Sequence, residues 1–226
     1  MNQFVLPLTI LSVAVAVGVV TGVVGRRRER RRTAALADAA DGLGFEFHPD
    51  GDPVLTDRLA RFHLFSQGHS SRLWNVLRGR TRDLDVAVFD YRYTVGRGKN
   101  RRTYSTTVAC FRADDLDLPA FVLRPEGFWS RLGVSLLGRQ DINFGTHPAF
   151  SKAYLLRGPD EAAVREVFGE PVLAYFEGQP RVSVEAAGGT LLYYRHASRV
   201  EPADARAFLT DGFAVLGLFR EPPPTS

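Results

Sequence analysis

The sequence predicts an α+β fold, in which an antiparallel β-meander and packed helices follow an N-terminal transmembrane helix. Three observations lead to this prediction. An uncharged apolar run opens the chain, strand-like runs separated by short turns fill residues 73–111, and helical patterns alternate with further strands up to residue 220. The strands outnumber the helical crossovers that a parallel sheet would need, which favours α+β over α/β.

The first element is the apolar run FVLPLTILSVAVAVGVVTGVV, residues 4–24, which contains 21 residues and no charge. At about 1.5 Å per helical residue it is roughly 30 Å long, which matches the hydrocarbon core of a bilayer. A cleaved signal peptide would carry basic residues before this run and a small-residue cleavage site after it, but here the arginines come afterwards. We therefore predict a transmembrane helix over residues 4–25, with residues 1–3 outside the cytoplasm.

The next segment, residues 26–32, reads RRRERRR and carries a charge of +5, whereas the whole chain carries +4. A dense arginine cluster stays on the cytoplasmic side, which predicts a single-pass protein of the inner membrane with a cytoplasmic C-terminal domain. The rest of the chain is close to neutral, so no nucleic-acid partner is predicted. The cluster either contacts anionic headgroups or serves only as a stop-transfer signal. Its members are Arg26, Arg27, Arg28, Arg30, Arg31 and Arg32.

Small residues recur every fourth position inside the apolar run, at Ala14, Gly18 and Gly22. Such a stripe lets two helix backbones approach closely, so a homodimer through the transmembrane helix is one hypothesis. Glycine is common in membrane helices for other reasons, so the stripe is also compatible with a single copy.

The cytoplasmic part begins with a basic juxtamembrane segment and helix over residues 26–44, which has apolar residues on one stripe and glycines at its end. An α+β domain follows over residues 45–220, which could divide into subdomains 45–138 and 139–220, and a disordered tail covers residues 221–226. Expected strands cover residues 73–80, 84–95, 101–111, 120–124, 151–157 and a hairpin within 181–196; expected helices cover residues 126–138, 158–169 and 202–219.

The stretch YTVGRGKNRRTYSTTV, residues 93–108, resembles a phosphate-binding loop at first sight. A Walker A loop needs GxxxxGK[ST] before a helix, and the dinucleotide fingerprint needs a third glycine where Arg101 stands. Neither pattern is met, and a strand follows the loop. Residues 96–100 are therefore predicted to be a five-residue hairpin loop, in which glycine supplies positive φ angles.

This loop length predicts the register of the two strands. Val95 would face Arg101, Val88 would face Val108, and Arg92 would face Tyr104. Asp90 would face Thr106 among apolar neighbours. It would be either a carboxylate bonded to Thr106 or Arg92, or a general base with a raised pKa; the first reading is favoured because no partner acid or nucleophile is visible.

Four basic residues, Arg97, Lys99, Arg101 and Arg102, lie at the hairpin tip with no acid among them. The tip is either simply solvated or contacts anionic lipid headgroups or an acidic partner. Tethering to the membrane would raise the local concentration of such a tip, so that even a weak contact would be populated.

The residues that commonly carry catalysis form no recognisable motif. Cys110 is a lone cysteine in a strand pattern, which is typical of a buried packing residue. The five histidines do not cluster, and neither HExxH nor GxSxG occurs. No metal and no cofactor is predicted. These patterns argue against the common enzyme classes that sequence can reveal, and not against every enzyme.

Several stretches, PAFSKAYLLRGPDEAAVREVF, RVSVE, VAVFDYRYTVGRGK with TTV, and LPAFVLRPE, resemble single-pass membrane-anchored bacterial proteins of unknown function. The high Arg and low Lys content is typical of GC-rich genomes, such as those of actinobacteria. The resemblance implies a fold and an envelope location and carries no catalytic residues.

These observations together favour a single-pass membrane protein with a non-enzymatic cytoplasmic interaction or sensor domain. Two alternatives remain open at this stage. One is a membrane-tethered enzyme whose site is assembled from scattered residues, and the other is a module that binds anionic lipids or phospholigands.

Overall fold

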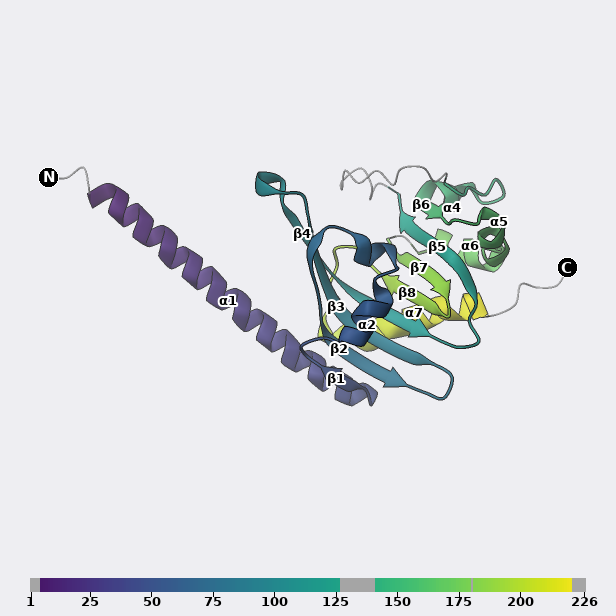
Figure 1. Cartoon of the computed structure of the whole chain (residues 1–226), viewed down its shortest axis with the longest axis horizontal. Coiled ribbons are helices and arrows are strands. Elements are labelled where there is room, and N and C mark those ends of the chain that lie inside the picture. The colour runs from purple at the N-terminus through teal and green to yellow at the C-terminus, as the bar shows by residue number, and fades with distance from the viewer. Residues whose placement is uncertain (1–4, 127–140, 180, 221–226) are drawn as a thin grey trace.

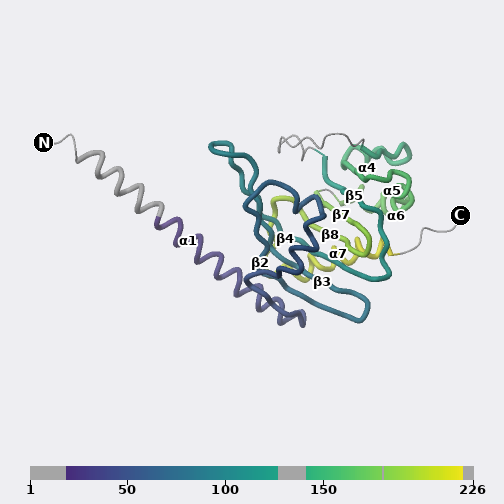
Figure 2. Tube along the Cα trace, in the orientation of Figure 1, coloured from purple at the N-terminus to yellow at the C-terminus, as the bar shows by residue number. Residues whose placement is uncertain are grey.

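The protein is described by a computed structural model, which covers residues 5–126, 141–179 and 181–220, with side chains from Val19 onward. Figures 1 and 2 show a long N-terminal helix, α1 (Val5–Leu43), which leaves a mixed domain as a straight arm. The transmembrane segment and the juxtamembrane helix expected from the sequence are parts of this one helix. Its 39 residues correspond to a length of about 58 Å.

A single antiparallel sheet of eight strands forms the centre of the domain, in the order β1-β2-β3-β4-β8-β7-β5-β6. Strands from both halves of residues 45–220 therefore share one open sheet, and the pairing of β4 with β8 joins the two halves. The strands are β1 (Glu46–His48), β2 (His69–Arg80), β3 (Asp85–Val95), β4 (Arg102–Arg112), β5 (Leu118–Pro125), β6 (Tyr154–Arg157), β7 (Ser183–Gly188) and β8 (Thr190–Tyr194).

Helices cover both faces of the sheet. The α-helices after α1 are α2 (Pro53–Leu59), α4 (Pro148–Ala153), α5 (Glu161–Val167), α6 (Glu170–Glu177) and α7 (Ala205–Arg220), and the short 3₁₀ turns are η1 (His63–Ser66), η2 (Gly98–Asn100) and η3 (Pro202–Asp204). One core lies between the sheet and α1, α5, α6 and α7, and a smaller core lies between the opposite face and the α2–η1 segment. The α+β class expected from the sequence is thus confirmed.

The alternation of side chains along β3 shows how the strand serves both cores. Val86 and Val88 point into the core beneath α1, whereas Ala87 and Phe89 point into the core beneath α2. Asp90 has the parity of Val86 and Val88, so it faces α1. Leu36 and Ala40 of α1 are buried against the same core, which fixes the C-terminal part of the helix on the sheet.

The β3–β4 hairpin forms as expected, but its register differs by one residue. The loop has six residues, 96–101, with the η2 turn inside it, and Val95 pairs with Arg102. Val88 therefore faces Ala109, Asp90 faces Thr107 and Arg92 faces Ser105, so the predicted pairs were wrong. Gly96 has a φ of 76°, and a Cβ there would collide with the carbonyl oxygen of Asn100, which explains the glycine.

Two later elements also differ from the expectation. Residues 148–153 form α4, and only Tyr154–Arg157 continue as a strand, because Pro148 begins a helix just before it. The predicted helix after Gly158 is α5, with Asp160 as its N-cap, and Pro171 opens α6 instead of ending the chain's helical stretch. The hairpin of β7 and β8 and the helix α7 form as predicted. The helix expected over 126–138 lies almost entirely outside the described residues.

Among the helices whose side chains are described, none is long and apolar enough to cross a bilayer. Most of the apolar run at residues 4–24 precedes Val19 and so lies outside those side chains. The same holds for Ala14 and Gly18 of the small-residue stripe, and residues 221–226 also lie outside the described part.

Candidate membrane-proximal site

A buried ion-pair network joins α1 to the sheet at the point where the helix leaves the domain. Arg32 grips Asp90 with two hydrogen bonds, from Nε to Oδ2 and from Nη2 to Oδ1, each 2.8 Å long. Arg199 donates from Nη2 to the same Oδ2 at 2.9 Å. The side chain of Asp90 is 1% exposed, and that of Arg32 is 11% exposed. One buried carboxylate thus holds a residue of the helix and a residue of the C-terminal loop together.

Two neutral side chains also donate hydrogen bonds to the Asp90 carboxylate. Thr107 donates to Oδ1 at 2.9 Å, and Asn75 donates to Oδ2 at 3.1 Å. Asn75 has a φ of 53° within an irregularity of β2, between Trp74 and Leu77, which turns its amide toward the carboxylate. The Asn75 oxygen accepts a hydrogen bond from Thr33 of α1 at 2.9 Å. The bulge therefore adds a second link between the helix and the sheet.

The electrostatics of Asp90 favour its charged form. Burial alone raises the pKa of a carboxyl group, but the hydrogen bonds and charge of Arg32, the charge of Arg199 and the Asn75 bond outweigh burial. The pKa of Asp90 consequently lies below its ordinary value. A general base would need a raised pKa, so the carboxylate interpretation holds, with Arg32, Arg199, Asn75 and Thr107 as partners instead of Thr106 or Arg92.

Glu29 extends the network toward the N-terminus of α1. It accepts hydrogen bonds from both Nη atoms of Arg199, at 3.0 and 2.8 Å, and from the indole of Trp74 at 2.9 Å. Burial raises the pKa of Glu29, but the hydrogen bonds from Arg199 and Trp74 lower it by more than burial raises it. The pKa of Glu29 therefore lies below its ordinary value. The single acid of the RRRERRR segment therefore faces the domain.

The arginines of this segment are divided between two roles. Arg26, Arg27, Arg28, Arg30 and Arg31 are exposed, whereas Arg32 is buried in the Asp90 network and also donates to the carbonyl oxygen of Val200 at 2.7 Å. Arg32 thus differs from the sequence interpretation, which grouped it with the lipid-facing residues. A groove of about 460 Å³ runs beside it between α1 and the loop that carries Arg199, and Arg28 and Arg31 line it as well.

A second group of basic side chains continues from this junction to the hairpin tip. Arg72 and Arg92 are directly opposed on β2 and β3, both are exposed, and both lie over the ring of Trp74, at 5.9 and 5.6 Å. Like charges placed directly opposite each other destabilise a sheet, and the shared Trp74 ring offsets part of that cost through cation–π contact. We call the whole surface the basic edge; it comprises Arg26, Arg27, Arg28, Arg30, Arg31, Arg72, Arg92, Arg97, Lys99, Arg101 and Arg102, all exposed.

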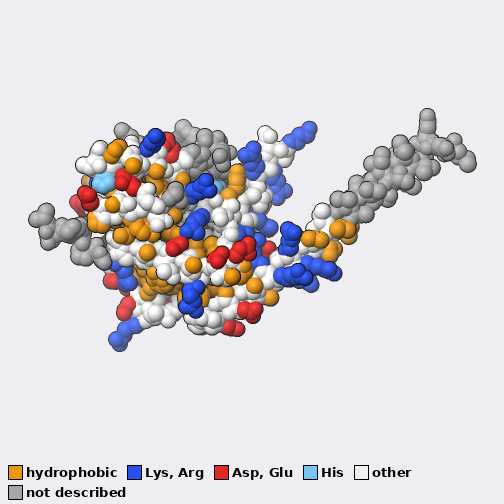
Figure 3. Space-filling model, turned by 180° about the vertical axis from the view of Figure 1, so that it is seen from behind, with side chains coloured by type: hydrophobic (Ala, Val, Ile, Leu, Met, Phe, Trp, Pro, Cys, Tyr) orange, Lys and Arg blue, Asp and Glu red, His pale blue; other side chains and the backbone are white. Residues whose placement is uncertain are grey.

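The basic edge faces the side from which the N-terminal half of α1 projects. Figure 1 shows the β3–β4 hairpin pointing the same way as that half of the helix, and Figure 3 shows Lys and Arg side chains between the hairpin and α1. The contacts explain this direction. Val86 shares a core with Leu36 and Ala40 of α1, whereas Asp90, further along β3, bonds Arg32, so β3 runs toward the N-terminus of α1.

The opposite face of the sheet holds a second buried polar group, centred on Glu185. Arg124 donates to Glu185 at 2.8 Å, Tyr194 donates at 2.7 Å, and the backbone N–H of Leu64 donates at 3.1 Å. Burial and the charge of Arg124 lower the pKa of nearby His63 to about 4. Because Glu185 is fully buried, the group ties η1 to the sheet and offers no surface to a substrate.

The comparisons with known proteins are consistent with the fold and silent on the chemistry. No family model and no curated protein sequence matches the chain. Among solved structures, the fold is similar to that of the mycobacterial trehalose monomycolate transport factor A, TtfA. The TM-score is 0.57 at 15% sequence identity, and the match covers 87% of this chain and 99% of the other. At this identity the likeness shows a shared fold, and function has to be argued from the site.

Proposed function

We propose that the protein is a single-pass protein of the bacterial inner membrane, whose cytoplasmic α+β domain is an accessory or sensor module that acts by binding and not by catalysis. One observation carries the proposal. The helix that would leave the bilayer is continuous with the helix that Arg32 and Asp90 lock onto the sheet. The anchor and the domain would then move as one body, with a fixed edge toward the membrane.

Two features support the membrane anchor. The run at residues 4–24 is long enough and apolar enough to span a bilayer, and arginines follow it directly. The described end of this run also exposes Val19, Val20, Val23 and Val24, which gives the helix an apolar surface without protein cover. A hydrocarbon environment would cover that surface. The stripe of Ala14, Gly18 and Gly22 extends the proposal to a homodimer through the membrane helix.

The non-catalytic role is supported by the state of the buried acids. Asp90 and Glu185 are each held by arginine and by neutral donors, in arrangements that join structural elements. The solved neighbour is named for a transport factor. From this likeness we take only the class of role, an accessory protein that serves transport.

A second candidate function is contact with anionic lipid headgroups through the basic edge. The opposed Arg72–Arg92 pair and the acid-free hairpin tip favour it, because both concentrate positive charge on the side of the anchor. Each basic side chain near an anionic surface contributes about 1 kcal/mol. The two candidates are compatible, since lipid contact would hold the domain in one orientation.

Reporter fusions test the proposed topology. Alkaline phosphatase, which is active only in the periplasm, and a fluorescent protein, which folds in the cytoplasm, are each fused after Ser226 of the full chain. We expect fluorescence and no phosphatase activity in the membrane fraction. Phosphatase activity from that fusion, or recovery of the full-length protein outside the membrane fraction, would overturn the proposal.

A further inference from the structure

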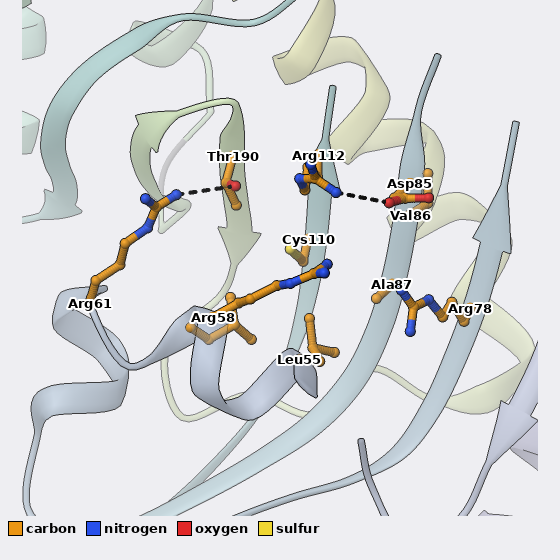
Figure 4. A pocket seen from close by; sticks show the side chains of 11 residues that line it. Leu55, Arg58, Arg61, Arg78, Asp85, Val86, Ala87, Cys110, Arg112 and Thr190 are labelled. Carbon is orange, nitrogen blue, oxygen red and sulfur yellow. Dashed lines mark hydrogen bonds and ion pairs between the residues drawn. The ribbon is translucent and has the colours of Figure 1, made fainter. Parts of the chain in front are cut away.

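A cavity of about 430 Å³ lies between α2 and the sheet, on the face opposite α1. Ala87 of β3 and Cys110 of β4 form its floor, and Leu55 and Leu59 of α2 contribute apolar side chains. Figure 4 shows Leu55 of α2 facing the strands that carry Ala87 and Cys110, with Thr190 of β8 at one end. The volume falls within the range of about 300–1,000 Å³ that is typical of small-molecule sites.

Four arginines from three parts of the chain surround this apolar floor: Arg58 and Arg61 from α2 and its C-terminal extension, Arg78 from β2, and Arg112 from β4. Asp85 is the one carboxylate among the lining residues. The lining therefore carries a net positive charge. Arg58 is exposed, and in Figure 4 its side chain extends from α2 toward Ala87, so its guanidinium can meet an anion that enters from solvent.

The contacts show which of these charges remain uncompensated. Arg78 is paired with Asp52 at 2.8 Å, and Arg112 approaches Asp85 at 3.4 Å. Arg61 donates to the carbonyl oxygen of Ala187 at 3.0 Å and to Thr190 at 3.4 Å, which are neutral acceptors. Arg58 forms no ion pair within the described part of the chain.

Arg58 and Arg61 are exposed and have no carboxylate partner within the described part of the chain, so both can receive an anion. Arg58 lies in α2, and Arg61 follows just after the end of that helix. Guanidinium groups match carboxylate and phosphate oxygens with paired hydrogen bonds. A bound inorganic ion would leave the apolar floor of the cavity hydrated. A ligand with a hydrocarbon group would cover that floor and remove it from water.

The position of the cavity indicates how the ligand arrives. Asp85 and Arg112 lie at the end of β3 and β4 that is remote from the hairpin tip. Eleven strand residues at about 3.3 Å each place the two ends roughly 35 Å apart. If the tip faces the bilayer, as the proposed function has it, the cavity opens toward the cytoplasm, and a dissolved ligand is the expected occupant.

We propose that this cavity is a binding site for a small anionic amphiphile: a phosphate monoester or carboxylate, bound by Arg58 and Arg61, whose hydrocarbon group lies on Ala87 and Cys110. The choice of a dissolved ligand rests on the proposed topology, whereas the site itself does not. Failure of the cavity proposal would be seen in the ligand-binding measurement, whereas failure of the proposed topology would be seen in the reporter fusions.

Calorimetric titration with phenyl phosphate tests the site. The full chain is held in nanodiscs of zwitterionic lipid, and empty nanodiscs give the reference heat. We expect one site that binds phenyl phosphate at least about tenfold more tightly than inorganic phosphate or phenol alone. Replacing both Arg58 and Arg61 by Ala should weaken binding about tenfold or more, as expected for lost charge-assisted hydrogen bonds.

The matched control replaces Arg97 and Arg101, two exposed arginines of the hairpin tip, by Ala and should leave the affinity unchanged. Ala87→Phe, which fills the cavity but keeps every arginine, should abolish binding, with circular dichroism verifying that the variant is folded. Equal affinity for phenyl phosphate and inorganic phosphate, or equal losses in the cavity and hairpin variants, would refute the site.

Nanodiscs that contain phosphatidylglycerol distinguish the source of the anion. A dissolved ligand predicts the same phenyl phosphate affinity in both lipids. A severalfold weaker affinity in the anionic nanodiscs would show competition by a lipid headgroup and would overturn the assignment to a dissolved ligand.

Discussion

Asp90 shows how one carboxylate can join three distant parts of a chain. Arg32 of α1, Thr107 of β4 and Arg199 of the C-terminal loop all donate to it. Removing water from a charge is costly, so such a group is stable only when its partners are all present. The sequence already predicted a buried acid, because Asp90 has the parity of Val86 and Val88. It could not predict the partners, since the register was off by one and Arg32 lies 58 residues away.

The first prediction concerns this carboxylate. Asp90→Asn should lower the free energy of unfolding by about 2–4 kcal/mol at pH 7, because Arg32 loses its carboxylate partner in a largely buried site and Arg199 keeps only Glu29. For a chain of this size that corresponds to a fall in Tm of roughly 5–10 °C. Thermal unfolding of the full chain in detergent, followed by circular dichroism, measures it. Asp115→Asn, which removes an exposed ion pair with Arg220, is the control and should change Tm little.

The pH dependence of the same difference gives a second readout. The pKa of Asp90 is lower in the folded chain than in the unfolded chain. Its stabilisation is therefore complete above the unfolded pKa of about 3.9 and is lost as the pH falls through the folded pKa. The gap between wild type and Asp90→Asn should be constant from pH 7 to pH 5 and shrink below about pH 4. A gap that closes already near pH 6 would mean that another group controls it.

At the scale of elements, the β3–β4 hairpin and α1 form one surface although about seventy residues separate them in sequence. The hairpin strands extend past the sheet toward the N-terminal half of the helix, and the exposed arginines of both elements form the basic edge. Trp74 links them, since its indole donates to Glu29 while Arg72 and Arg92 lie over its ring. A movement of the hairpin on lipid contact would therefore reach Glu29 of α1 through Trp74.

A depth-sensitive label tests whether the tip approaches the bilayer. Asn100→Cys carries a nitrobenzoxadiazole fluorophore in the full chain, in nanodiscs that contain anionic lipid and a headgroup-linked quencher. We expect strong quenching there and weak quenching at the control site Asp83→Cys, in the turn at the far end of β3. The native Cys110 should stay unlabelled, because burial raises the pKa of its thiol to about 12. Equal quenching at both sites would contradict lipid contact at the tip.

The elements also show where sequence reasoning succeeds and where it stops. The meander, the β7–β8 hairpin and α7 follow from alternation and helical period, which depend on neighbouring residues only. The division of residues 148–177 into α4, β6, α5 and α6 depends on Pro148 and Pro171, which can start a helix as readily as end one. The cavity arginines are spread from Arg58 to Arg112, and no local pattern announces that they meet.

On the scale of the whole molecule, the order of the sheet could not be obtained from the sequence. The pairing of β4 with β8 joins segments about eighty residues apart, and such contacts leave no periodic signal. The fold class could be predicted because it depends on the kinds of elements and not on their neighbours. The sites follow the same division. The arginine cluster of α1 and the basic hairpin tip were visible as composition, whereas the Arg72–Arg92 pair, the Asp90 network and the cavity depend on how the strands pair.

The unbroken length of α1 has a consequence for helical phase. Each residue turns an α-helix by about 100°, so the angle at which the domain faces the bilayer is set by the number of residues between the anchor and Arg32. Two alanines inserted after Arg27 should swing the hairpin about 200° around the helix axis and abolish quenching at residue 100; four should leave it only about 40° out of phase and restore much of the signal. A steady decline with insert length would instead reveal a flexible tether. If the periodic response is found, the number of residues between the anchor and Arg32 determines which face of the domain meets the membrane.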